Sequence, residues 1–372
     1  MTDKRKKQSN SVVPFAIIIV LLAVIVLILI VWAIKVALNI DKKDIGRSKF
    51  HNNDTSSLQE AADDFDPALL TKNYVYADIS QDELKRGYLA VNLSDTPSQP
   101  ADDLTGVYPK LFNGEGIQII SAKDARAEGS EEMLDALNQM LSDYFSESGK
   151  TSLMIDKAYS PIADSVDSTD EDNYYENDLY DEYGNYIGYM DSQDDSYDDA
   201  MIEEKCSGHE SGYDIDLSLY IKETNGFRAL NGSEEYKWLD QNAYKYGFVQ
   251  RYSENDADIS HYRYVGLAAA AVMKKENLGI EEFSEYIKGY SFDRPLMVKT
   301  KNGSQLLYYI ANSQMDLTTV QIPADNDGNT CRYDISGNNS DGYIVTVMPS
   351  VDFIESVSTK SADDVSSGSI SE

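Results

Sequence analysis

The chain has 372 residues and a formal net charge of −32 at pH 7, with a sequence pI of about 4.3. Nucleic acid and anionic lipid surfaces bind basic patches, so this charge excludes both classes of partner from our expectations. The length leaves room for one or two domains with a substantial core, in addition to an N-terminal segment of different character.

The N-terminal segment is predicted to anchor the chain in a membrane. Residues 15–34 carry no charge and are nearly all Ile, Val, Leu or Ala. A helix of this run is roughly 30 Å long at about 1.5 Å per residue, which spans a bilayer core. It has no polar face, which argues against the alternative of a buried core helix. Basic residues 4–7 place the N-terminus in the cytoplasm.

These features predict a single-pass protein of the cell membrane. We expect a cytoplasmic tail at residues 1–11, a transmembrane helix at 12–38 and a stalk at 39–65. Everything after the helix is then extracellular. A cleaved signal peptide is disfavoured because the apolar run is too long and no small-residue cleavage site follows it.

The first folded part, residues 66–290, is predicted to be an α+β domain. Helical spacing of apolar residues, with a serine at the start and a glycine at the end, predicts helices near 130–149 and 233–247, and a third helix is expected near 265–276. Short β-like runs occur at 116–120 and 152–155. Helices mixed with short strands, without strict β-α alternation, are typical of the α+β class.

The second folded part, residues 291–350, is predicted to be a small all-β domain. Asn302-Gly303 lies between two apolar runs and indicates a hairpin. Further strands are expected at 318–322, 331–335 and 343–348. The Ser- and Asp-rich residues 351–372 are typical of a disordered tail.

An acidic insertion, residues 164–204, interrupts the first part. It contains no Lys or Arg and seven tyrosines. A solvated insertion is the simpler interpretation, because no stretch has the spacing of a calcium loop. The two cysteines, Cys206 and Cys331, allow either one disulfide or two free thiols.

The candidate chemistry lies around the few histidines: His51, His209 and His261. After His209, the alternation of residues 213–219 places Asp214 and Asp216 on one face of a strand. Two imidazoles and a carboxylate with an open fourth position form a catalytic zinc site. From the residues alone, however, a hydrogen-bonded structural histidine is the more common explanation.

Three ordered blocks then resemble one family. Residues 207–216 (SGHESGYDID) resemble the motif S-x-H-x-x-G-x-A-x-D of the VanY-type D-alanyl-D-alanine carboxypeptidases. Residues 238–252 (WLDQNAYKYGFVQRY) are similar to that family's W-L-x-x-N-A-x-K-Y-G-F-x-x-R-Y, and residues 261–266 (HYRYVG) to the end of E-P-W-H-F-R-Y-V-G. Residues 87–92 resemble an upstream strand of the same group. The resemblance covers roughly residues 70–290.

The resemblance implies a zinc-peptidase-like fold, a zinc cofactor and, residue by residue, a site. It implies zinc ligands at His209, Asp216 and His261, and a general base at Asp258, where the family has Glu. Ser160 stands where the family has a catalytic Arg, so Lys157 is the candidate cation. The implied substrate contacts are Ser207, Tyr159 and Arg251. Asp214 replaces a small Ala, and we expect it to be solvated rather than a partner of a metal ligand.

The resulting prediction is a membrane-anchored zinc carboxypeptidase that trims D-Ala from peptidoglycan stem peptides outside a bacterial cell. The replacements at Asp258 and Ser160 keep an alternative open, a zinc-binding pseudoenzyme that binds cell-wall peptides without turnover. A third interpretation is a structural surface protein whose acidic insertion mediates contacts.

Overall fold

The computed structural model describes residues 62–91, 97–160, 178–180, 186–189, 208–222, 224, 226–251, 261–313 and 315–366. The expected cytoplasmic tail, transmembrane helix and nearly all of the stalk lie outside these residues. Among the helices that the structure describes, none is long and apolar enough to cross a membrane.

The larger sheet has six strands in the order β10-β11-β8-β5-β3, with β9 beside β8. The strands are β3 (Ser121–Ala122), β5 (Leu153–Lys157), β8 (Asp214–Ile221), β9 (Gly226–Arg228), β10 (Phe248–Gln250) and β11 (His261–Tyr264). The pairs β5-β8 and β8-β11, which matter for the site, are antiparallel. Segments far apart in the sequence therefore meet in the middle of this sheet.

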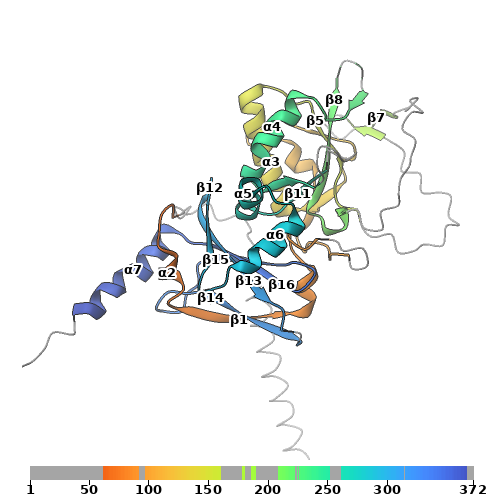
Figure 1. The fold of residues 1–372 in the computed structure, drawn as a ribbon. Coiled ribbons are helices and arrows are strands. Elements are labelled where there is room, and N and C mark those ends of the chain that lie inside the picture. Colours follow the sequence, from red (N-terminus) through yellow and green to blue (C-terminus); the bar gives the residue numbers. More distant parts are fainter. Residues whose placement is uncertain are drawn as a thin grey trace, which may run out of the picture. The chain divides into compact units, whose positions relative to one another are not determined.

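Three helices pack on this sheet: α3 (Glu131–Ser148), α4 (Glu234–Asn242) and α5 (Leu267–Glu276). Their apolar side chains form one buried cluster with Ile215 and Leu217 of β8. In Figure 1 the helices lie on one side of β5 and β8. Because side chains alternate along a strand, the opposite face of β8 carries Asp214 and Asp216. The mixture of helices and short strands on which the α+β prediction rested is confirmed.

The predicted helix ends are also confirmed. Ser130 caps α3 by accepting a hydrogen bond from the backbone N–H of Met133, and Gly149 ends it with a φ of 68°. Ser233 caps α4 in the same way. A short 3-10 turn, η4 (Ala243–Tyr246), follows α4 and ends at Gly247 with a φ of 89°. Left-handed φ values suit glycine, which explains both ends.

The second sheet has four strands in the order β12-β13-β16-β15. The strands are β12 (Leu296–Thr300), β13 (Gly303–Ala311), β15 (Arg332–Gly337) and β16 (Gly342–Met348). The register Thr300↔Gly303 confirms the predicted Asn-Gly hairpin. One face, including Leu307 and Ile344, joins the core of the larger sheet. The other face, including Tyr308 and Val345, belongs to a second core.

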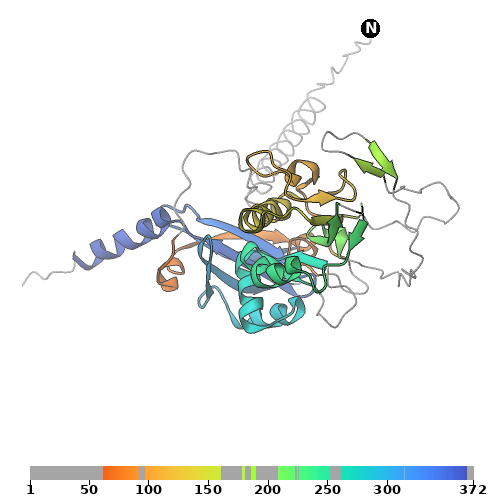
Figure 2. The ribbon, with the colours of Figure 1, turned by 90° about the horizontal axis from the view of Figure 1, so that it is seen from above.

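A strand from the start of the described chain completes this second core. β1 (Tyr74–Ser80) pairs antiparallel with β14 (Leu317–Pro323). Both views show the orange β1 beside the blue C-terminal strands (Figure 1, Figure 2). β1 falls within the expected range 66–290, so the strand pairing crosses the expected boundary at residue 290.

Helix α7 (Val351–Ser366) corrects the expectation of a disordered tail from residue 351. Phe353 and Val357 are buried in the second core, four residues apart on one helical face. The Ser- and Asp-rich composition hid this apolar spacing.

The remaining elements are short. They are α2 (Pro67–Leu70), η1 (Gln81–Lys85), β2 (Leu104–Gly106), η2 (Tyr108–Leu111), β4 (Glu128–Ser130), β6 (Asp178–Tyr180), β7 (Tyr186–Tyr189), η3 (His209–Ser211), α6 (Ile280–Tyr286) and η5 (Ile287–Gly289). β6 and β7 form a hairpin inside the acidic insertion. Cys331 is a buried free cysteine, and Cys206 lies outside the described residues.

Candidate metal centre

Two neighbouring strands and one short turn bring the candidate ligands together. His261 pairs directly with Asp216 across β11 and β8. Directly paired residues of antiparallel strands point to the same face, so both side chains project from one side of the sheet. His209 begins the turn η3, which leads through Gly212 (φ 77°) into β8. The turn folds back over the strand and places the His209 ring beside Asp216.

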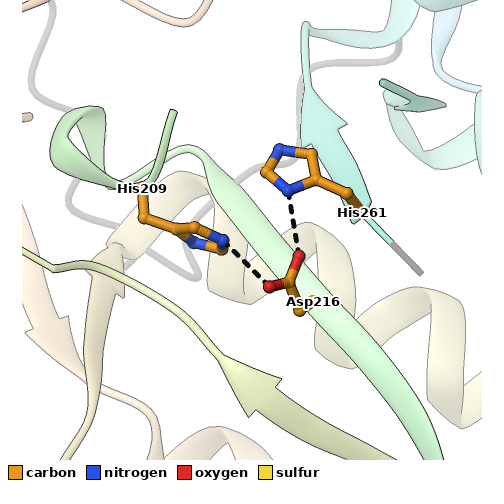
Figure 3. A group of neighbouring side chains, drawn as sticks. All are labelled: His209, Asp216 and His261. Atoms are coloured by element: carbon orange, nitrogen blue, oxygen red, sulfur yellow. Dashed lines mark hydrogen bonds and ion pairs between the residues drawn. The ribbon is translucent and has the colours of Figure 1, made fainter. Parts of the chain in front are cut away.

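The three side chains form a tight group, which we call the metal-facing trio: His209, Asp216 and His261. His209 Nε2 lies 3.1 Å from Asp216 Oδ2, and His261 Nδ1 lies 2.9 Å from Asp216 Oδ1 (Figure 3). One potential ligand atom from each residue lies within 4.8 Å of the others. Both histidines are buried, at 2% and 3% exposure, whereas the Asp216 side chain is 18% exposed.

The trio fits a zinc ion by its chemistry and by its incomplete hydrogen bonding. Among the described residues, His209 Nδ1 and Asp216 Oδ1 are buried without a hydrogen-bond partner. The 2.9 Å approach of Asp216 Oδ1 to His261 Nδ1 is a charged contact without hydrogen-bond geometry. Buried polar atoms are nearly always paired with protein, water or an ion, so both residues keep bonding capacity that the described residues do not use. Two imidazoles and a carboxylate are a zinc donor set.

The electrostatics of the trio favour a protonated His261 when no metal is bound. Burial alone lowers the pKa of His261, but its contacts with Asp214 and Asp216 outweigh burial and raise the pKa to about 9. Burial likewise opposes ionisation of Asp216, yet its close contacts with His209 and His261 hold its pKa well below the usual range. A metal-ligating imidazole must be neutral, so a metal ion and this proton compete for the site.

The expectation that Asp214 is solvated was wrong. Its side chain is 0% exposed and lies directly behind the trio. Asp214 Oδ1 is 3.0 Å from His261 Nε2, and Asp214 Oδ2 accepts a hydrogen bond of 3.1 Å from Ser211 Oγ and another from Arg263 Nη1. Burial opposes its charge, but Arg263 and His261 hold its pKa below the usual range.

The contact between Asp214 and Arg263 follows from the spacing of both residues relative to the ligands. Arg263 lies two residues after His261, as Asp214 lies two residues before Asp216, and the two pairs are in register on β11 and β8. Arg263 was not among the predicted site residues. Its partnership with Asp214 becomes visible only when the two strands are known to be neighbours.

Of the other predicted site residues, some lie beside the trio, one pairs elsewhere, and two lie outside the described residues. Lys157 is exposed at the end of β5. Its backbone lies opposite that of Asp216 in the β5-β8 strand pair, next to an irregularity in the register. The backbone N–H of Ser160 donates to the carbonyl of His209 at 3.3 Å, so the chain after β5 runs beside the trio through Tyr159. The guanidinium of Arg251 instead pairs with Glu281 of α6 at 2.7 Å. Ser207 and Asp258 lie outside the described residues.

Comparison with known proteins agrees with this site. The model of the family "VanY: D-alanyl-D-alanine carboxypeptidase" matches residues 171–267, a segment that contains the whole trio. A D-alanyl-D-alanine carboxypeptidase of Enterococcus faecium is 34% identical over 152 residues, covering 38% of this chain and 44% of the relative. The resemblance to the VanY-type carboxypeptidases is confirmed.

Further matches support the same conclusion about the family. Putative carboxypeptidase YodJ of Bacillus subtilis strain 168 is 39% identical over 92 residues, covering 22% of this chain and 33% of that protein. The chain therefore spans less than half the length of these curated relatives.

Solved structures bear on the fold. The vancomycin resistance D,D-dipeptidase VanXYg, in complex with a D-Ala-D-Ala phosphinate analog, has a TM-score of 0.50 at 20% identity. The match covers 74% of this chain and 100% of that one, and it supports a shared fold. A solved VanY mutant from the VanB-type resistance cassette, in complex with Zn(II), matches at a TM-score of 0.31 and 20% identity over 53% of this chain and 98% of that one.

Proposed function

We propose that this chain is a zinc-dependent carboxypeptidase that removes the terminal D-Ala from peptidoglycan stem peptides. The observation that carries the proposal is the convergence of His209, Asp216 and His261 within a segment that matches the VanY family. The names of the matched relatives give the substrate class, since they describe carboxypeptidases and a dipeptidase of D-Ala-D-Ala.

In this proposal the trio holds the metal. Zinc in such a site supplies Lewis-acid polarisation of a carbonyl and activation of water near neutral pH. The carboxylate of Asp258 takes a proton from the attacking water and passes it to the leaving amine of D-Ala. Asp258 is one methylene shorter than the Glu of the family, and a misplacement of about 1 Å can cost on the order of a hundredfold in rate.

Lys157 is the proposed cation of the site. It lies opposite Asp216 on the neighbouring strand, where paired side chains share one face of the sheet. Its ammonium group can stabilise the negative charge that develops on the scissile carbonyl oxygen. The backbone of Ser160 contacts the backbone of His209, so the side chain of an arginine at position 160 would be attached next to the trio. Lysine offers a point charge where the family uses a planar fork.

Substrate contacts and cellular location complete the proposal. Ser207, Tyr159 and Arg251 are the proposed substrate contacts, and Arg251 pairs with Glu281 through Nη1. We place the domain outside the cell on the transmembrane helix at residues 12–38. Protease added to intact cells is then expected to remove the domain and leave a protected fragment of about the first forty residues. A soluble, anchor-free protein in the medium would contradict the anchor.

The decisive experiment measures D-Ala released from a stem pentapeptide that ends in D-Ala-D-Ala. Zinc-loaded wild type is compared with Asp258→Ala, which should lose about 10²–10⁴-fold in rate if Asp258 is the base. Asp258→Glu restores the family's reach and should keep or raise the rate. Lys157→Ala tests the cation, with Lys150→Ala as a control, because Lys150 pairs with Glu235 away from the trio.

A second candidate, a zinc-bearing peptide binder without turnover, is favoured by one observation. Ser160 is adjacent to His209 and carries no charge where the family has Arg. The binder predicts that the pentapeptide binds by calorimetry while neither wild type nor Asp258→Glu releases D-Ala. Turnover that appears only in Asp258→Glu combined with Ser160→Arg would establish the binder and reject the natural enzyme.

A further inference from the structure

The side chain of Asp214 occupies a position where its two oxygens have different partners. Oδ1 faces His261 Nε2 at 3.0 Å, while Oδ2 faces Ser211 Oγ at 3.1 Å and the guanidinium of Arg263. Nδ1, the other nitrogen of His261, faces Asp216 in the trio. Asp214 and Asp216 therefore hold opposite edges of a single imidazole ring.

The surroundings of Asp214 are built to keep it in place. Arg263 is 1% exposed, and its remaining nitrogens donate to the backbone carbonyls of Tyr88 (3.0 Å) and Ala90 (2.8 Å). Because Arg263 is held on both sides, it fixes the carboxylate that it neutralises. An ionised group this deeply buried is stable only with such partners.

Gly208 provides the room that the Asp214 carboxylate needs. A Cβ at position 208 would lie 3.2 Å from Cγ and Oδ1 of Asp214, which is tighter than ordinary packing. Gly208 also has a φ of 93°, a left-handed value that favours glycine. The larger Asp214, in place of the family's alanine, is thus accommodated by the residue just before His209.

We propose that Asp214 is a positioning residue for the metal centre. It accepts the Nε2–H of His261, so the lone pair of that ring is left on Nδ1, the nitrogen that faces Asp216. Mutation of a carboxylate that orients a metal-ligating histidine in this way typically lowers metal affinity about 10–100-fold. The inference rests on the proposed zinc site and adds a role for a residue at which the chain departs from the family motif.

Asp214→Asn is the variant that separates orientation from packing. Ser211 and Arg263 both donate toward Oδ2, so the amide oxygen must take that side and the NH₂ group must face His261 Nε2. An NH₂ donor there requires a lone pair on Nε2, which moves the ring proton to Nδ1 and blocks the ligand atom. The same substitution behind a catalytic histidine is known to enforce the wrong tautomer.

The experiment measures zinc affinity by chelator competition, the visible spectrum of the Co(II)-loaded protein, and the melting temperature of the metal-free protein. Asp214→Asn should bind zinc about 10–100-fold more weakly than wild type and show an altered Co(II) spectrum. Asp214→Ala imposes no tautomer, so its folded fraction should lose less affinity than Asp214→Asn. Glu235→Gln is the control, because that buried carboxylate accepts hydrogen bonds from Ser152 and Lys150, which lie just before the start of β5.

The outcomes are distinguishable. Asp214→Asn with zinc affinity within twofold of wild type overturns the inference, whatever happens to the melting temperature. If Asp214→Ala does not fold, the zinc affinity of Asp214→Asn compared with that of wild type still tests the inference. A wild-type protein that binds no zinc would instead defeat the proposed function, and that result is read from the same titration.

Discussion

The two aspartates of β8 occupy the same face of one strand, two residues apart, in opposite environments. Asp214 has three hydrogen-bonding neighbours and no exposure. Asp216 is 18% exposed, contacts two histidines and keeps a buried oxygen that, among the described residues, has no hydrogen-bond partner. We call Asp214, Ser211 and Arg263 the supporting network. The complete pairing of Asp214 fits a group that holds the fold, and the unpaired oxygen of Asp216 beside two histidines fits a group that binds a metal ion.

This contrast separates two kinds of variant. Changes in the metal-facing trio should act first on metal binding, and loss of His261 should in addition lower the stability of the metal-free protein, because its ring contacts both Asp214 and Asp216. Changes in the supporting network should alter folding, because they leave a buried charge without its partner.

Removal of a trio imidazole should have the largest effect. Wild type is expected to carry about one zinc per chain, and His209→Ala and His261→Ala should each abolish it, since two remaining ligands hold zinc poorly. Elemental analysis of purified protein measures the ratio. His51→Ala, a histidine outside the trio, should keep full zinc. Full zinc in both trio variants would show that the ligands lie elsewhere.

Removal of Arg263 should have the next largest effect. Arg263→Met leaves the buried carboxylate of Asp214 in contact with His261 and Ser211 but without its guanidinium partner, which should cost about 3–5 kcal/mol in the unfolding free energy of the metal-free protein. Urea denaturation measures this cost. The matched control is Arg251→Met, whose partner Glu281 is 57% exposed. That solvated pair should contribute only about 0–1 kcal/mol. Equal losses in both variants would contradict the comparison.

The pH dependence of metal-free stability follows from His261. Its pKa rises from 6.5 to about 9 on folding, so the protonated ring stabilises the folded state. This contribution is complete below pH 6.5 and is lost as the pH rises through about 9. The shift corresponds to roughly 3 kcal/mol. Urea denaturation with a chelator at pH 6 and pH 9.5 should show the loss in wild type and a much smaller one in His261→Ala. The same slope in both proteins would refute the pairing.

The smallest effect concerns the link between the supporting network and the second sheet. Ser336 Oγ of β15 accepts a hydrogen bond from the backbone N–H of Leu89 at 2.9 Å, next to the carbonyls that hold Arg263. Ser336→Ala should cost about 1 kcal/mol in unfolding free energy. Zinc affinity should change little, because Ser336 bonds Leu89, and the bonds of Arg263 to Tyr88 and Ala90 remain. A loss of zinc as large as that of Asp214→Asn would mean that the second sheet controls the metal centre.

Local signals explain what the sequence could predict. Capping serines and terminal glycines located α3 and α4, and an Asn-Gly pair located the β12-β13 hairpin. The alternation after His209 put Asp214 and Asp216 on one face, and the family motifs added His261. Each of these signals lies within a short stretch of chain.

Long-range pairing explains what the sequence could not predict. The pairing of β1 with β14 joins strands from opposite ends of the described chain and has no local signature. Burial of Asp214 depends on the β8-β11 register and on the segment from Tyr88 to Val91, so its charge alone suggested solvent. The buried face of α7 was hidden by the serines around Phe353 and Val357.

The most direct test of the zinc-peptidase assignment is a zinc titration of D-Ala release from the stem pentapeptide. Metal-free protein receives increasing equivalents of zinc, and the initial rate is measured at each point, with Asp216→Asn in parallel. We expect the wild-type rate to rise linearly and to level off at about one zinc per chain, while Asp216→Asn stays at the background rate. A rate that is independent of zinc, or no release from fully loaded wild type, would contradict the assignment.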